Sequence, residues 1–246
     1  MQTPLAIVTG ASRGLGRAMA QQLLDQGWRV LAIARHPATD LRTPGPAALV
    51  SWPLDLSQGL EAAQRLAGWL ATQPPCRVAL IHNAAALSEP APLADSDLSE
   101  LRAAVRVGLE APLLMTAAFL KATAEWGTDR RVLNISSGLG RRAMAGSVSY
   151  CAVKAGLDHL TRALALEEAN RPHGARVVSL APGVIDTDMQ AQLRQADPAG
   201  FPDVAMFVAL HDQGQLDSPE AAAATVLHYL QRDDFGQVPV ADVRQP

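Results

Sequence analysis

Short apolar runs alternate with longer stretches of helical periodicity along the whole chain. The apolar runs predict strands at about 5–9, 28–34, 48–54, 76–83, 130–136, 175–180 and 238–240. The periodic stretches predict helices at about 16–26, 59–72, 97–125, 148–170 and 219–231. Strands that alternate with helices form crossover units, so this order predicts one α/β domain over residues 1–246. We expect a doubly wound, mainly parallel sheet of about seven strands with helices on both faces.

Composition agrees with such a domain and excludes several other classes of protein. Apolar residues make up 48% of the chain and charged residues 18%, which allows a large core. The 21 basic and 24 acidic residues give a net charge of −3, which argues against a nucleic-acid partner. Cys76 and Cys151 form neither a disulfide framework nor a metal-binding spacing, so we expect no metal. No apolar run reaches the ~18–20 residues of a membrane span, and the first strand leaves no room for a signal peptide. The expected location is the cytoplasm.

A glycine-rich turn follows the first predicted strand. Glycine permits a tight turn and a close approach of the backbone to a pyrophosphate, and the next helix offers free N–H groups at its start. A plain turn between strand and helix is the alternative, because the spacing differs from the usual G-x-G-x-x-G. The expected contacts of this turn with a dinucleotide come from Gly10, Ser12, Arg13, Gly14, Leu15 and Gly16.

Two arginines indicate which dinucleotide is bound. The second strand ends at Ala34 and Arg35, without the acid that would bind a ribose 2′-hydroxyl. Arginine suits a 2′-phosphate, and Arg13 in the glycine turn can approach the same group. The sequence therefore predicts NADP(H) rather than NAD, with a solvated surface charge as the alternative for either arginine.

Tyr150 and Lys154 are four positions apart in a predicted helix, and Ser137 lies thirteen positions before the tyrosine. This spacing places the phenol and the ammonium on one helix face. A phenol titrates near pH ~10 and needs a nearby cation to act at neutral pH, which Lys154 can supply. A half-buried tyrosine beside a surface lysine is the alternative for an isolated pair.

Six segments resemble, in their order and spacing, the short-chain dehydrogenase/reductase family over essentially the full chain. They are TGASRGLG at 9–16, LDL at 54–56, HNAA at 82–85, NISS at 134–137, YCAVK at 150–154 and PGVIDT at 182–187. The resemblance implies an NAD(P)-binding Rossmann domain. It implies that Asp55, beside Leu56, contacts the adenine and that Asn83, beside Ala84, supports the strand next to the cofactor. The residues that it implies for the nicotinamide carboxamide are Pro182, Gly183, Ile185 and Thr187.

The resemblance also implies a reaction, the reduction of a small-molecule carbonyl by hydride from NADPH. Ser137 would orient the substrate oxygen, Tyr150 would donate the proton, and Lys154 would lower the tyrosine pKa and bind the ribose. The thirteen-residue spacing favours Ser137 over Ser136 and Asn134. Two alternatives remain: oxidation of an alcohol by the same residues, and an NADP-binding sensor or scaffold without catalysis.

One departure from the family pattern concerns Gly108. The family has an asparagine here, whose main-chain carbonyl holds a relay water near the lysine. Pro112 has no N–H, so the Gly108 carbonyl lacks its helical partner and is free to bind the water instead. We therefore keep Gly108 in the expected catalytic set and expect Gly108→Asn to change turnover little. A milder departure is Ala85, where the family has glycine.

The last third resembles more narrowly the branch that holds sepiapterin reductases and bacterial benzil reductases. The likeness rests on APGVIDTDMQ at 181–190, LDSPE at 216–220, and DDF at 233–235 followed by Asp242. It implies that Asp242 contacts the substrate; a solvated acid is the alternative. The family also implies a homodimer or homotetramer through the helices near 100–121 and 148–170.

We expect residues 188–217 to form a lid over the substrate. Its apolar residues are Met189, Leu193, Phe201, Met206 and Phe207. They favour a hydrophobic or aromatic carbonyl compound, such as a diketone, and Met189 is the lid residue expected at the substrate. Ordinary packing of an amphipathic helix would give the same pattern.

Overall fold

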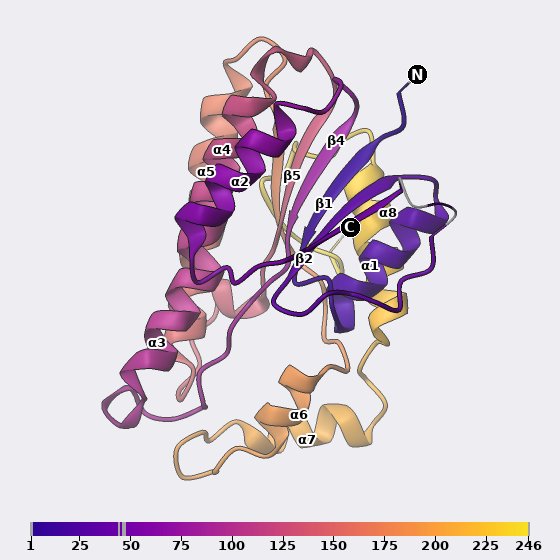
Figure 1. Ribbon diagram of the computed structural model, residues 1–246. Helices are drawn as coiled ribbons and strands as arrows, with labels where there is room; N and C mark the ends of the chain where they lie inside the picture. Colours follow the sequence, from indigo (N-terminus) through magenta and orange to yellow (C-terminus); the bar gives the residue numbers. More distant parts are fainter. Residues whose placement is uncertain (1, 44, 46–47, 246) are drawn as a thin grey trace.

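The computed structural model describes residues 2–43, 45 and 48–245 (Figure 1). Within these residues, seven parallel strands form one sheet in the order β3-β2-β1-β4-β5-β6-β7. The strands are β1 (Leu5–Thr9), β2 (Arg29–Ala34), β3 (Leu49–Pro53), β4 (Val78–His82), β5 (Arg130–Ile135), β6 (Arg176–Ala181) and β7 (Val240–Asp242). The doubly wound parallel sheet that the sequence predicts is confirmed. Of the connection expected at 36–46, Pro44 and Pro46 lie outside the described residues.

The central strands show why the apolar runs identify them. Every residue of β1 and of β4 is buried, as expected for strands covered on both faces. The strand order reverses between β1 and β4, and such a reversal leaves a crevice outside the carboxyl ends of the strands. The sheet therefore offers a ligand site at that edge.

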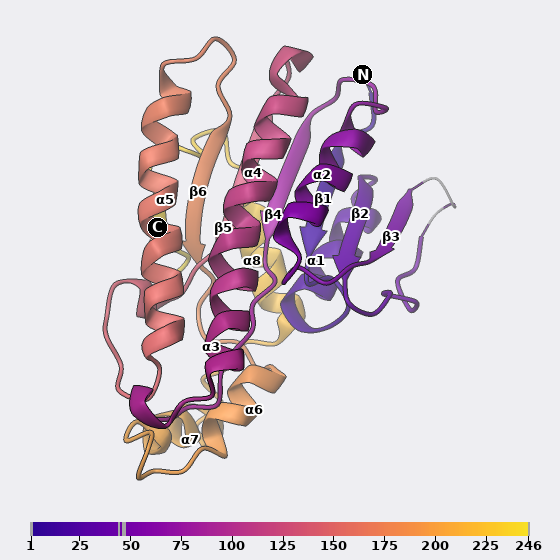
Figure 2. The ribbon, with the colours of Figure 1, turned by 60° about the vertical axis from the view of Figure 1, so that its left-hand side comes forward.

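Helices cover both faces of the sheet (Figures 1 and 2). On one face, α1 (Gly14–Asp25) and α8 (Pro219–Gln231) bury side chains such as Leu23 and Val226. On the other face, α2 (Gly59–Leu70), α4 (Ala111–Ala122) and α5 (Val148–Ala169) enclose a second core that includes Leu66 and Phe119. The two cores hold the sheet between them.

The helix expected at 97–125 contains an irregular turn. It runs from α3 (Leu98–Val105) through a π-helical turn (Arg106–Glu110) into α4. The Ala111 N–H donates to the Arg106 carbonyl, and Pro112, which has no N–H, follows directly. By length and composition alone, the 25 residues Leu98–Ala122 could cross a membrane. The sequence did not indicate this, because charged residues interrupt the apolar run. In this fold, Met115 and Phe119 of the same helix are fully buried against the sheet.

A small lobe lies beyond the carboxyl end of the sheet. It contains α6 (Asp188–Arg194) and α7 (Val204–Asp212), which lie apart from the other helices in Figure 1. Its core consists of Met144, Ala196, Phe201, Val204 and Phe207. Gly146 has a φ of +71°, and a Cβ there would lie 2.6 Å from the Gly200 carbonyl oxygen, so the lobe packs closely on this loop.

Candidate active site

A cavity of about 1360 Å³ lies at the carboxyl ends of the strands. Its walls come from the segments that follow β1 to β7, from the start of α1, and from α5, α6 and α7. It therefore occupies the crevice at the reversal of the strand order and extends under the lobe.

The turn after β1 fits closely against the end of β4. Gly10 has a φ of +68°, and a Cβ there would lie 2.9 Å from the Ala84 Cα. A Cβ on Gly16 would collide with the Gly10 carbonyl oxygen and the Asn83 amide. The Asn83 amide donates to the carbonyls of Thr9 and Gly10, at 3.0 and 3.3 Å. Asn83 therefore holds the turn in shape, and both glycines are required by space.

The start of α1 faces the same cavity. Gly14, Leu15 and Gly16 line the cavity, and no described side chain caps the helix at Arg13. Uncapped N–H groups at a helix start attract an anion, so the turn fits a pyrophosphate.

The residues expected to select the dinucleotide line the neighbouring wall. Arg35 is exposed at the end of β2, and Asp55 follows β3 and accepts from the Ser57 N–H at 2.9 Å. Arg13 forms an ion pair of 2.6 Å with Asp188 at the start of α6, and both side chains are exposed. A cation from the glycine turn thus reaches the lobe across the cavity.

Tyr150 and Lys154 lie one turn apart near the start of α5, and both line the cavity. The Lys154 Nζ lies 5.5 Å from the centre of the Tyr150 ring and donates to the Ile135 carbonyl at 2.7 Å. Burial lowers the pKa of Lys154 to about 8, and the Asp158 carboxylate, one turn further, acts in the opposite direction. Burial raises the pKa of the Tyr150 phenol, and hydrogen bonding with Ser137 opposes that increase. The expected lowering of the tyrosine pKa by Lys154 is not found, because burial dominates.

Three polar residues at the end of β5 have different surroundings. Ser137 lines the cavity, and its hydroxyl oxygen accepts from the Leu139 N–H at 3.2 Å, while the same hydroxyl is hydrogen-bonded with Tyr150. Ser136 instead donates to the buried Asp158 at 2.5 Å. Asn134 is completely buried and donates to a threonine of α5. Of the three, Ser137 is the one whose hydroxyl lies at the cavity beside Tyr150 and not in a bond with the buried core.

Gly108 does not line the cavity but contacts α5. A Cβ at this position would lie 2.5 Å from Cγ1 of Val153. Val153 is buried and belongs to the same turn of α5 as Tyr150 and Lys154. This close approach argues against the expectation that Gly108→Asn changes turnover little, because an added side chain requires Val153 or α5 to shift. Ala85, by contrast, is exposed, so its methyl group is accommodated.

The segment 182–187 links β6 to α6 and lines the cavity. Gly183 has a φ of +88°, a conformation that favours glycine. Ile185 forms a bridge with Asp217, whose carbonyl accepts from the Asp186 N–H at 2.9 Å. A Cβ on Gly14 would lie 3.6 Å from the Thr187 side chain, so this segment reaches the glycine turn.

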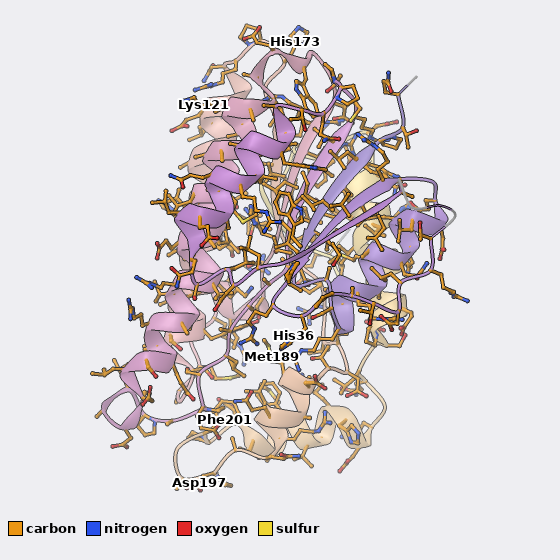
Figure 3. All side chains as sticks on the ribbon, viewed as in Figure 1. His36, Lys121, His173, Met189, Asp197 and Phe201 are labelled. Atoms are coloured by element: carbon orange, nitrogen blue, oxygen red, sulfur yellow. The ribbon has the colours of Figure 1, made fainter. Side chains whose placement is uncertain are left out.

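The apolar residues of the lobe divide into two groups. Met189, Leu193, Met206 and Phe207 line the cavity, with Met189 on the side of the lobe that faces the sheet (Figure 3). Phe201 does not, because it is completely buried in the core of the lobe. Of the apolar lid residues, Phe201 therefore takes the alternative role of ordinary packing.

The sequence-predicted site residues that line this one cavity are Gly10, Ser12, Arg13, Gly14, Leu15, Gly16, Arg35, Asp55, Leu56, Asn83, Ala84, Ser137, Tyr150, Lys154, Pro182, Gly183, Ile185, Thr187 and Met189. Gly108 and Asp242 are not brought to its wall. Among the described residues, no group of three or more His, Cys, Asp or Glu side chains could hold a metal ion.

Arg244 is a cavity residue that the sequence reasoning missed. It lines the cavity and pairs with Asp242, which is itself 6% exposed. An aspartate often accepts from the backbone N–H two residues further on, as Asp242 does from Arg244, so the D-x-R spacing was a usable signal. Asp188, the partner of Arg13, carried no such signal.

Comparison with known proteins agrees with this geometry. A family model described as short chain dehydrogenase matches residues 4–198. A benzil reductase ((S)-benzoin forming) from Bacillus cereus is 34% identical over 237 residues, covering 94% of this chain and 95% of the relative. A sepiapterin reductase from Rattus norvegicus is 33% identical over 252 residues, covering 94% and 92%. The crystal structure of a metagenomic short-chain oxidoreductase in complex with NADP superposes with a TM-score of 0.73 at 27% identity, covering 97% of this chain and 95% of that one. The chain belongs to the short-chain dehydrogenase family.

Proposed function

We propose that this protein reduces the carbonyl of a ketone or diketone to an alcohol with hydride from NADPH. The observation that carries the proposal is that Ser137, Tyr150 and Lys154 share one cavity with the glycine turn. Relatives named for the reduction of benzil and of sepiapterin, each similar over most of the chain, support the same type of reaction.

The residues of the cavity fit an NADP dinucleotide. Gly10 and Gly16 let the turn pack tightly against the end of β4, and the uncapped start of α1 suits the pyrophosphate. Arg35 at the end of β2 is the exposed cation on this wall that suits a 2′-phosphate, and Arg13 can join it by exchanging its pairing with Asp188. A relative of known structure that holds NADP supports this choice. When bound, the nicotinamide supplies the hydride.

The protein residues then orient the carbonyl and supply the proton. Ser137 donates a hydrogen bond to the carbonyl oxygen, and Tyr150 gives its proton to that oxygen as negative charge develops. Burial raises the pKa of Tyr150, so the phenol carries the proton that reduction consumes. Lys154 holds a positive charge 5.5 Å from the centre of the tyrosine ring and would bind the nicotinamide ribose.

Removal of the phenol proton tests the proposal. We expect Tyr150→Phe to lower kcat for a diketone by about 10²- to 10⁴-fold, because no other acid replaces it. NADPH affinity, measured by fluorescence titration, should remain near the wild-type value. A Phe variant that still turns over would exclude Tyr150 as the acid. A wild-type protein that binds NADPH tightly but reduces no diketone or pterin would favour the sensor.

Arg35 tests the choice of dinucleotide. A lost charged hydrogen bond should lower the preference for NADPH over NADH in Arg35→Asp by roughly tenfold to a hundredfold. The ratio of the two kcat/KM values is the measurement. Arg42→Asp, an exposed change in the same connection but off the cavity wall, is the matched control. An unchanged ratio in Arg35→Asp would argue against a 2′-phosphate site.

We also propose a homodimer or homotetramer and a cytoplasmic location. Leu98, Val105 and Leu113 are exposed along α3 and α4, and Val148 and Leu166 are exposed on α5. These apolar side chains suit contact with a second copy. Both cysteines are free, which fits a reducing compartment.

A further inference from the structure

A fixed arginine lies beside the catalytic serine. Asp242, at the end of β7, accepts from Nε and Nη2 of Arg244 at 2.8 and 2.7 Å, and from the Arg244 main-chain N–H at 3.0 Å. Arg141 approaches the same carboxylate at 3.7 Å. A bidentate hydrogen bond with a carboxylate fixes the plane of a guanidinium. Asp242 therefore orients Arg244.

The oriented guanidinium faces the substrate end of the cavity. Arg244 lines the wall, whereas Asp242 does not. A Cβ on Gly138, the residue after Ser137, would lie 4.0 Å from Nη2 of Arg244. The Nη1 group makes no hydrogen bond with any described residue, and the side chain is 59% exposed. Two N–H groups are therefore available to a ligand.

The lobe side of the same cavity is mainly apolar. It presents Leu139, Met144, Met189, Leu193, Met206 and Phe207, while Arg142, Gln190 and Gln192 also line the cavity. Asp186 and Asp188 also line the cavity, but they lie near Arg194 and Arg13 respectively, at 3.6 and 2.6 Å. An apolar compartment with an available guanidinium favours a ligand with an apolar body and an acceptor oxygen.

We propose that Arg244 determines specificity by binding a second acceptor oxygen next to the reacting carbonyl. The substrate class is thus a vicinal dicarbonyl compound with an aromatic or aliphatic body, either a 1,2-diketone or a 2-oxo acid. The inference rests on the proposed function, since Ser137 must hold the reacting oxygen. Asp242 then acts as a positioning residue for Arg244. This role takes the place of the direct contact with the substrate that the sequence had suggested for Asp242.

Three ketones with one skeleton test the inference. 1-Phenylpropane-1,2-dione has the second acceptor, propiophenone lacks it, and phenylglyoxylate carries it as a carboxylate. In Arg244→Leu, the ratio of kcat/KM for the dione to that for propiophenone should fall about tenfold to a hundredfold, the effect of losing a hydrogen bond to a charged donor. A larger fall for phenylglyoxylate than for the dione identifies a carboxylate as the natural acceptor; the reverse identifies a ketone.

The chain contains a matched control. Arg232 forms the same contact with Asp234, through Nε at 2.8 Å and Nη2 at 2.7 Å, away from the cavity wall. Arg232→Leu should leave the ratio unchanged. The double variant Asp242→Asn/Arg244→Leu leaves no unpaired buried charge. If its kcat/KM ratio falls as much as that of Arg244→Leu, unfolding is excluded as the cause. Asp242→Asn alone should give a smaller loss, because Arg244 remains but is less fixed.

Binding separates this inference from the proposed function. Calorimetry with NADP⁺-loaded protein measures the affinity for the dione without hydride transfer. Weaker binding of the dione by Arg244→Leu supports the inference even if wild-type protein reduces no ketone, which would defeat the proposed function alone. Equal affinity and an equal kcat/KM ratio in wild type and Arg244→Leu would overturn the inference. A loss in Asp242→Asn that exceeds the loss in Arg244→Leu would also overturn it, in favour of direct contact by Asp242.

Discussion

The catalytic lysine depends on a small group of buried polar residues. Asp158 accepts from Ser136 at 2.5 Å and from Ser179 at 2.6 Å, so it ties the ends of β5 and β6 to α5. Its carboxylate also favours the charged form of Lys154, whose Nζ donates to the Ile135 carbonyl. A buried ammonium is tolerated only where such partners compensate its lost hydration. The charge beneath Tyr150 is therefore set by strand ends as well as by the helix.

The contact between Gly108 and Val153 gives a prediction at the same scale. Valine has a restricted χ1, so a side chain at position 108 must push α5 and with it Tyr150. We expect Gly108→Asn to lower the free energy of unfolding by about 1–3 kcal/mol, and to lower kcat. Thermal unfolding and diketone reduction measure the two effects.

The rescue variant decides whether crowding is the cause. Val153→Ala removes the methyl group that a Cβ at position 108 would meet, so Gly108→Asn/Val153→Ala should recover stability and turnover relative to Gly108→Asn. Val153→Ala alone is the control for the lost core volume. If Gly108→Asn alone has wild-type stability and turnover, α5 accommodates the added side chain, and the crowding prediction is wrong.

At the scale of elements, the sequence predicts the strands better than the irregular segments. Each predicted strand is present within two residues of its predicted ends, because buried parallel strands are continuous apolar runs. The π turn was not predicted, although Gly108 and Pro112 indicated a loosened helix there. Apolar periodicity locates a helix but does not specify how its hydrogen bonds shift around a proline.

The lobe shows a second limit of the same kind. Phe201 and Phe207 are both buried aromatic residues six positions apart, with ring centres 5.5 Å apart. Only Phe207 reaches the cavity, while Phe201 fills the core of the lobe. A sequence pattern gives both residues the same meaning, because the difference depends on which loop packs beneath the lobe. The glycine turn, by contrast, was predictable from the sequence. At Gly10 and Gly16 any side chain would clash with the backbone, so the presence of glycine has a single structural meaning.

At the scale of the whole molecule, one buried histidine links the core to acid stability. His82 ends β4 next to Asn83, is 3% exposed, and its Nε2 lies 2.9 Å from the Thr116 hydroxyl of α4. Burial lowers its pKa to about 3. Its unfolded-state pKa is about 6.5. Between these values the unfolded chain binds one more proton than the folded protein, so stability falls as the pH falls below about 6.5.

We therefore expect His82→Gln to flatten this pH dependence. Gln cannot titrate, and its amide can replace the contact with Thr116. From pH 7 to about 4.5, wild-type protein should lose roughly 2–3 kcal/mol more unfolding free energy than the variant. Urea denaturation at both pH values gives the difference, even if the variant is less stable at pH 7. His211→Gln, at an exposed position of α7, should keep the wild-type slope. Equal slopes for wild type and His82→Gln would mean that His82 is protonated inside the folded core.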